Sequence, residues 1–323
     1  MIAVEPGPNR HVATQEVSKS MNAMRMLAVG VCAALAAVAW PAAPAVADPI
    51  SFMDLLARPR PAATARIHYG NAPSQFADLW LPDGNGPHPV VAMLHGGCWR
   101  ADLPGVDLMA YAADDLRRRG IAVWNIEYRR LGEAGGGYPS TFEDVAAAVD
   151  WLRKVADANK LDLKNVVAVG HSAGGQLALW AAARPRLPKA SALRHGDPLP
   201  IKAVVSLAGI DDLAAYRASG PPACGGPRVI DLLDGTGSRS PWDIFTDTSP
   251  AEMLPLRVPQ TIVSGALDPI VPAPFGRAYA AKAKAAGDPV QEITLAGAGH
   301  FELIDPQSSA FEQIRSIIRQ YLK

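Results

Sequence analysis

The sequence has no excess charge of either sign and very little cysteine. Its 323 residues carry 31 Lys and Arg against 31 Asp and Glu, so the formal net charge is +0. A balanced charge gives no electrostatic attraction for a polyanion, so we expect no nucleic acid partner. Three cysteines are too few for a disulfide scaffold. The chain is instead 49% hydrophobic, which is enough to bury a large core.

Metal and cofactor signatures are also missing. No group of Cys, His, Asp and Glu has metal-ligand spacing, and no G-x-G-x-x-G motif follows an expected strand. The sequence therefore predicts chemistry that needs neither a metal nor another cofactor.

The one long apolar run lies near the N-terminus, from Met26 to Trp40, and it is too short to span a bilayer. Ala45-Val46-Ala47 follows it and has the A-x-A pattern of a signal-peptide cleavage site. We therefore expect export to a secreted or periplasmic location, with residues 1–47 as signal peptide and an overlong start. No stable membrane insertion is expected after cleavage. A membrane anchor, with Cys32 lipidated, is the weaker alternative.

Residues 48–323 are expected to form a single domain in which short β-rich runs alternate with helical patterns. The expected strands are 65–69, 76–81, 90–94, 121–126, 166–169, 204–207, 261–264 and 291–295. The expected helices are 105–119, 142–157, 174–183, 275–286 and 307–322. This order predicts an α/β fold with a mostly parallel central sheet and helices on both faces. The stretch 209–257 interrupts the order and is interpreted as a cap-like excursion.

The first chemical motif is His95-Gly96-Gly97-Cys98-Trp99, directly after an apolar strand pattern. Two successive glycines allow a sharp turn and leave backbone N–H groups free to face a ligand. An H-G-G motif is weak evidence by itself and gains its value from a second motif further along the chain.

The second motif, Gly170-His171-Ser172-Ala173-Gly174, is a G-x-S-x-G pattern between an expected strand and an expected helix. This context holds the serine on a tight turn with its hydroxyl above the sheet. The Ala173 N–H and the positive end of the helix dipole can then stabilise an oxyanion. We therefore predict that Ser172 is a nucleophile.

A serine hydroxyl needs a base and an acid that orients the base. Asp268 and His300 each follow an expected strand, and their order after Ser172 is the order that α/β-hydrolases use. Asp243 and Asp247 are rival acids, disfavoured because no strand end holds them. The rival bases are His195, in a Pro-rich loop, and His171, whose side chain we expect to point elsewhere.

These motifs resemble the α/β-hydrolase superfamily, in particular its esterase branch with kynurenine formamidase-like bacterial carboxylesterases. The likeness extends over about residues 65 to 322. It rests on H-G-G-x-W at 95–99, G-H-S-A-G-G at 170–175, G-x-x-D-x-x-V-P at 265–272 and G-H-F at 299–301. The resemblance implies a Ser172, Asp268 and His300 triad. It also implies an oxyanion hole formed by N–H groups of Gly97 or Cys98 together with Ala173.

The expected function is that of an exported serine carboxylesterase acting on a small-molecule ester with a short-chain or aryl acyl group. Arylformamidase-like amide hydrolysis and non-catalytic binding remain alternatives. Trp99 is a candidate wall of the substrate pocket, with packing as the other interpretation. Cys98 and Cys224 either pair or stay unpaired as small hydrophobic residues.

The excursion is not expected to act as a lipase lid. The run Gly220 to Pro227 is rich in Gly and Pro, and scattered Asp residues leave no wide apolar stripe. The sequence predicts that 209–257 supplies no lid helix with a wide apolar face, and that this segment narrows the pocket.

Overall fold

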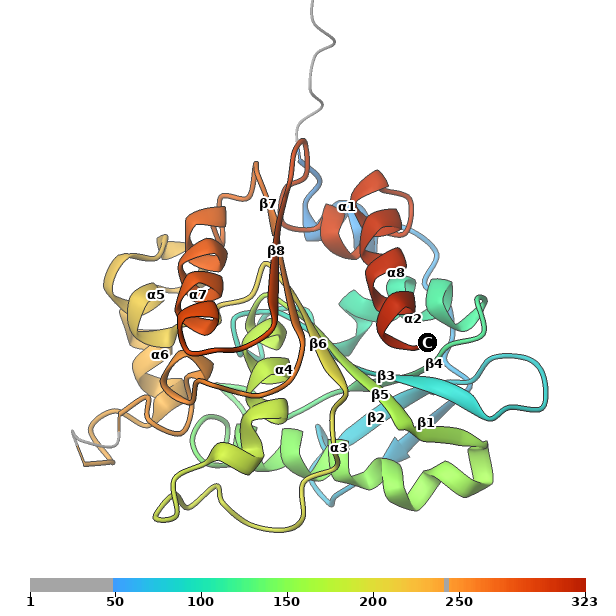
Figure 1. Ribbon diagram of the computed structural model, residues 1–323, viewed down its shortest axis with the longest axis horizontal. Coiled ribbons are helices and arrows are strands. Elements are labelled where there is room, and N and C mark those ends of the chain that lie inside the picture. The colour runs from blue at the N-terminus through green and yellow to red at the C-terminus, as the bar shows by residue number, and fades with distance from the viewer. Residues whose placement is uncertain (1–48, 241–243) are drawn as a thin grey trace, which may run out of the picture. The chain divides into compact units, whose positions relative to one another are not determined.

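The computed structural model describes residues 49–240 and 244–323 (Figure 1). The expected signal peptide and Asp243 lie outside these residues. The centre is an eight-stranded sheet with the order β1-β2-β4-β3-β5-β6-β7-β8. The strands are β1 (Ala65–His68), β2 (Phe76–Trp80), β3 (His88–Leu94), β4 (Ala122–Ile126), β5 (Leu161–His171), β6 (Ala203–Leu207), β7 (Gln260–Gly265) and β8 (Val290–Leu295).

All eight expected strands are present, with bounds shifted by a few residues. β1 and β2 pair antiparallel with their neighbours, and the remaining strands are parallel. β6 is buried along its whole length, as is typical of parallel strands covered on both faces. The expected mostly parallel sheet is confirmed.

Helices cover both faces of the sheet. They are α1 (Phe52–Leu56), α2 (Ala110–Arg117), α3 (Ser140–Asn159), α4 (Ala173–Ala183), α5 (Leu213–Ser219), α6 (Pro227–Asp234), α7 (Ala273–Ala285) and α8 (Ser309–Tyr321). In Figure 1, α1, α2 and α8 lie on one side of the sheet, and α3, α4 and α7 lie on the other. Within residues 49–240 and 244–323, no helix is long and apolar enough to cross a membrane.

Capping and periodicity explain why the last helix forms where it does. The Ser308 hydroxyl accepts a hydrogen bond of 3.0 Å from the backbone N–H of Phe311, which caps the start of α8. Phe311, Ile314 and Ile318 then recur at spacings of three and four residues and are buried. One face of α8 therefore packs on the sheet while the opposite face stays polar.

The excursion contains two short helices that the sequence did not predict. Its glycines and prolines separate two helices, because a proline fits the first turn of a helix. Asp212 caps α5 by accepting a 2.9 Å hydrogen bond from the N–H of Ala215, and α6 begins at Pro227. Both helices are short. The apolar face of α6, formed by Val229, Ile230 and Leu233, is buried.

The strand order determines where a site can form. The chain runs outward from β3 to β4 and then returns to place β5 beside β3 on the other side. The connections that follow β3 and β5 consequently continue to opposite faces of the sheet, with α2 on one face and α4 on the other (Figure 1). Open α/β sheets bind ligands at such a point.

Asp211, in the loop after β6, is buried. Its Oδ1 accepts a 2.8 Å hydrogen bond from the Ser206 hydroxyl, while Oδ2 has no partner in the described residues. Burial raises the pKa of Asp211 to about 7, although the Ser206 hydroxyl acts in the opposite direction. The fold therefore favours the protonated carboxyl.

This predicts a pH-dependent gain in stability for Asp211→Asn. Because the pKa in the fold lies above the ordinary 3.8, wild-type stability is lost as pH rises from about 4 to about 7. The loss amounts to about 4 kcal/mol at most. Thermal melts should show the variant gaining roughly 5–10 °C over wild type at pH 8.5 and much less at pH 4.5. A difference that does not change with pH would contradict this interpretation.

Candidate active site

Ser172 lies on a sharp turn between β5 and α4. Its φ of 55° and ψ of −122° are unusual for a residue with a side chain, and such strain is typical of functional turns. The flanking glycines are required sterically, since a Cβ on Gly170 would overlap the carbonyl of Gly174. A Cβ on Gly174 would overlap the carbonyl of Leu94. The strand, turn and helix context predicted for Ser172 is present.

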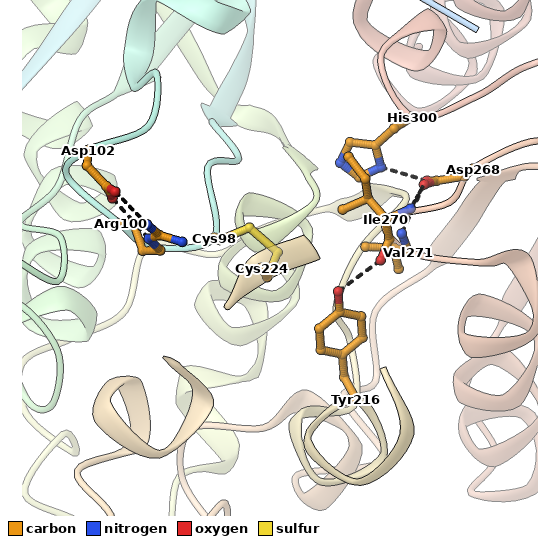
Figure 2. Close-up of a disulfide and its surroundings, with 9 residues drawn as sticks. All are labelled: Cys98, Arg100, Asp102, Tyr216, Cys224, Asp268, Ile270, Val271 and His300. Atoms are coloured by element: carbon orange, nitrogen blue, oxygen red, sulfur yellow. Dashed lines mark hydrogen bonds and ion pairs between the residues drawn. A yellow bond between two sulfur atoms is a disulfide. The ribbon is translucent and has the colours of Figure 1, made fainter. Parts of the chain in front are cut away.

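His300 and Asp268 meet at the ends of β8 and β7. The His300 Nδ1 lies 2.6 Å from Asp268 Oδ2, and both side chains are buried. The other carboxylate oxygen accepts hydrogen bonds of 2.7 Å and 2.9 Å from the N–H groups of Ile270 and Val271 (Figure 2). These bonds hold the carboxylate in one orientation toward the ring.

Ser172 and His300 line one cavity of about 120 Å³. Among the described residues, no hydrogen bond joins the Ser172 side chain to the His300 ring. In structures without substrate, hydrogen bonds between catalytic groups are often long and tighten only when substrate binds. The remaining walls are mostly apolar. They are formed by Phe52, Gly97, Cys98, Leu103, Pro104, Leu108, His171, Ala223, Ile270 and Phe301.

The loop after β3 lies directly against the turn at Ser172. A Cβ on Gly96 would be 3.0 Å from Ser172 Cβ and 3.0 Å from His171 Nδ1. Gly97 and Cys98 line the cavity, and both have positive φ, 101° and 51°. Ala173 is the first residue of α4, where backbone N–H groups lack partners within the helix. Gly97 and Cys98 on one side of Ser172 and Ala173 on the other therefore stay the predicted oxyanion donors.

A buried charged network supports this loop from below. The His95 Nε2 lies 2.8 Å from Glu127 Oε1, and the Tyr128 hydroxyl donates a 2.9 Å hydrogen bond to the His95 carbonyl. Burial opposes ionisation of Glu127, but His95 and Arg130 outweigh it and lower the Glu127 pKa to about 2. Glu127 therefore stays charged. The sequence assigned no role to His95 or Glu127.

Trp99 does not line the cavity, which corrects its assignment as a substrate wall. Its indole is completely buried and donates a 3.1 Å hydrogen bond to Gln176 Oε1 on α4. The Gln176 amide in turn donates a 2.7 Å hydrogen bond to the Thr248 carbonyl in the excursion. Trp99 therefore packs, and Gln176 joins the loop after β3 to the excursion.

His171 does not point away from the site, contrary to expectation. Its ring centroid lies 4.4 Å from that of His300, and its Nε2 lies 3.0 Å from the His300 carbonyl oxygen. Since a carbonyl only accepts, Nε2 carries the proton. Burial lowers the pKa of His171 well below its usual value, and the neighbouring His300 acts in the same direction. The ring is neutral and supports the His300 loop.

The other rival residues lie elsewhere. Asp247 is buried, with its carboxylate 2.5 Å from Arg239 Nη2 and 2.6 Å from the Ser191 hydroxyl. His195 is exposed on its loop. Neither residue lines the cavity that contains Ser172.

Cys98 and Cys224 form a disulfide, with 5.3 Å between their Cα atoms. The sequence left pairing open. The bond joins the loop after β3 to Pro222–Cys224, a short 3₁₀ turn between α5 and α6.

Comparison with known proteins agrees with this architecture. The chain belongs to the BD-FAE family, whose family model matches residues 77–282, more than half of the chain. A search of curated protein sequences finds no match.

Solved structures of esterases have the same fold. A truncated carbohydrate esterase from gut microbiota is 21% identical with a TM-score of 0.66, covering 84% of this chain and 98% of its own. Butyrate-bound Est2, an esterase from Thermogutta terrifontis, is 21% identical with a TM-score of 0.63. The match covers 81% of this chain and 94% of Est2. A bifunctional GH43-CE from Bacteroides eggerthii is 21% identical with a TM-score of 0.65. It matches over 79% of this chain, which spans only 35% of that protein.

The predicted α/β-hydrolase fold is therefore confirmed. The family and these neighbours support a hydrolase that acts on esters. The finer likeness to kynurenine formamidase stays a prediction.

The geometry predicts that Ser172→Ala removes hydrolysis. Without the hydroxyl no acyl-enzyme can form, so kcat on p-nitrophenyl acetate should fall by about 10⁵- to 10⁶-fold. The melting temperature should stay near that of wild type because only one oxygen is removed. Turnover at a wild-type rate in the purified variant would exclude Ser172 as the nucleophile.

A second prediction separates Asp268 from its rival. Asp268→Asn presents the wrong tautomer to His300 and should lower kcat by about 10⁴-fold. Asp247→Asn is the matched control. It removes one carboxylate partner of Arg239 and should lower the thermal stability, but kcat should stay within about tenfold of wild type. An equal loss of kcat in both variants would show that the acid is misplaced.

Proposed function

We propose that this protein is an exported serine esterase that hydrolyses esters with short acyl groups. The observation that carries the proposal is the 2.6 Å contact between His300 and Asp268, beside a small apolar cavity that His300 shares with Ser172. A buried imidazole held by a carboxylate is what an inert hydroxyl needs to become a nucleophile.

In the proposed mechanism, His300 takes the proton of Ser172 while the serine oxygen attacks the acyl carbonyl. Asp268 holds the imidazole tautomer and stabilises the cation that forms. N–H groups of Gly97 or Cys98, together with that of Ala173, bind the oxyanion. The alcohol leaves with the proton from His300. Water then attacks the acyl-enzyme by the same steps and releases the acid.

The size of the cavity supports a short acyl group over an aryl one. An apolar cavity of about 150 Å³ holds one benzene molecule. The cavity at Ser172 is about 120 Å³. An acetyl, propionyl or butyryl group fits within it, whereas an aromatic acyl group must extend through the mouth. Butyrate is the ligand named for the Thermogutta structure.

Export is part of the proposal and has independent support in the disulfide. Bonds such as Cys98–Cys224 persist mainly in oxidising compartments outside the cytosol. The expected signal peptide gives the same location.

A panel of p-nitrophenyl esters tests the acyl preference. We expect kcat/KM for acetate to butyrate to exceed that for octanoate and longer chains by at least about tenfold, because the cavity cannot enclose the longer chain. N-formylkynurenine in the same panel tests the amide alternative, and we expect slow turnover. A preference for palmitate, or faster hydrolysis of the formamide, would contradict the proposal.

Tributyrin tests whether the excursion behaves as a lid. Because α6 is only eight residues long and none of them lines the Ser172 cavity, a movement of α6 would not open the site to a lipid surface. We therefore expect no jump in rate as tributyrin passes its solubility limit.

A further inference from the structure

The segment that joins α5 to α6 reaches the Ser172 cavity through Ala223. We call residues 217–228, from the end of α5 to the start of α6, the strap. Most of its side chains are exposed and Cys224 is the only buried one. Ala223, next to it, lines the cavity. The strap thus adds one small side chain to the site.

Two contacts attach the strap and the residue before it to opposite sides of the site. Before it, the hydroxyl of Tyr216 donates a 2.8 Å hydrogen bond to the carbonyl of Ile270, two residues after Asp268. Within it, Cys224 is bonded to Cys98 in the loop after β3. Figure 2 shows the disulfide on one side and the His300, Asp268 and Tyr216 group on the other.

Other hydrogen bonds of the strap are local. The N–H of Gly220 donates a 2.7 Å hydrogen bond to the Tyr216 carbonyl. The N–H of Gly225 donates a 2.8 Å hydrogen bond to the Pro222 carbonyl. The ion pair of Arg217 with Asp231 is exposed and contributes little. With so little buried surface, the disulfide is the contact that holds the middle of the strap against the site.

We propose that Ala223 is a specificity-determining residue that sets the longest acyl chain the enzyme accepts, and that the Cys98–Cys224 disulfide holds it in place. The inference rests on the proposed esterase function and extends it. A larger side chain at 223 narrows the mouth. Loss of the covalent link lets the strap move outward and admits longer chains.

The experiment compares ratios of kcat/KM within each variant, so a general loss of activity does not affect it. Ala223→Leu adds three carbons at the mouth and should lower the butyrate to acetate ratio about tenfold, since one methylene in an apolar pocket is worth at least that. Cys224→Ala should raise the octanoate to butyrate ratio about tenfold. Arg228→Ala changes an exposed strap residue outside the cavity lining and is the matched control, with unchanged ratios expected.

Alkylation of the unfolded chain, measured by mass, checks the link itself. In the exported protein, residues 48–323, we expect neither cysteine to react before reduction and both Cys98 and Cys224 to react after it. A butyrate to acetate ratio within twofold of wild type in Ala223→Leu would overturn the role of Ala223, even if Cys224→Ala does not fold. Alkylation of Cys98 and Cys224 without reduction, or unchanged ratios in folded Cys224→Ala, would overturn the role of the disulfide. Absence of Ser172-dependent hydrolysis in wild type would instead refute the proposed function.

Discussion

The site depends on the backbone contact between the loop after β3 and the turn after β5. Gly96 lies so close to Ser172 that an added Cβ would be 3.0 Å from the serine Cβ. Contact at this distance requires β3 and β5 to be neighbours with their carboxyl ends level, which the strand order provides. It also requires the loop to turn within three residues, and Gly97, Cys98 and Trp99 all have positive φ. Such a loop persists only where its surroundings hold it.

Two buried groups near this contact, Glu127 and His171, are each held in one protonation state by their surroundings. Glu127 is kept ionised by His95 and Arg130 despite its burial, so it can support the loop after β3 from below. His171 is kept neutral by burial and by His300. A neutral ring matters there, because a second cation 4.4 Å from His300 would oppose the imidazolium that the proposed mechanism forms.

Sequence patterns revealed the parts of the structure that depend on local physics. Runs such as Val90 to Leu94 indicated buried strands, and the glycines around Ser172 marked the turn because no other residue fits. Contacts between distant segments left no such signal. The disulfide joins residues 126 positions apart, and the contact of Trp99 with Gln176 depends on how α4 packs. The Gly and Pro residues of the excursion were interpreted as helix breakers, although they lie at helix ends, where the same residues are favoured.

The sheet and the excursion contribute different parts of the site. Strand ends carry the proposed nucleophile, acid and base, whereas the strap adds only Ala223 to the cavity wall. Yet Tyr216, directly before the strap, is bonded to the carbonyl of Ile270 near the proposed acid, and Cys224 of the strap is bonded to Cys98 near the proposed oxyanion donors. A displacement of the strap must therefore also strain the backbone that positions Asp268 or the oxyanion donors. With the proposed roles of the strap and of the triad, we therefore expect selection of the acyl group and alignment of the catalytic groups to be coupled. A longer chain that pushes the strap outward should then be disfavoured at the chemical step as well as in binding.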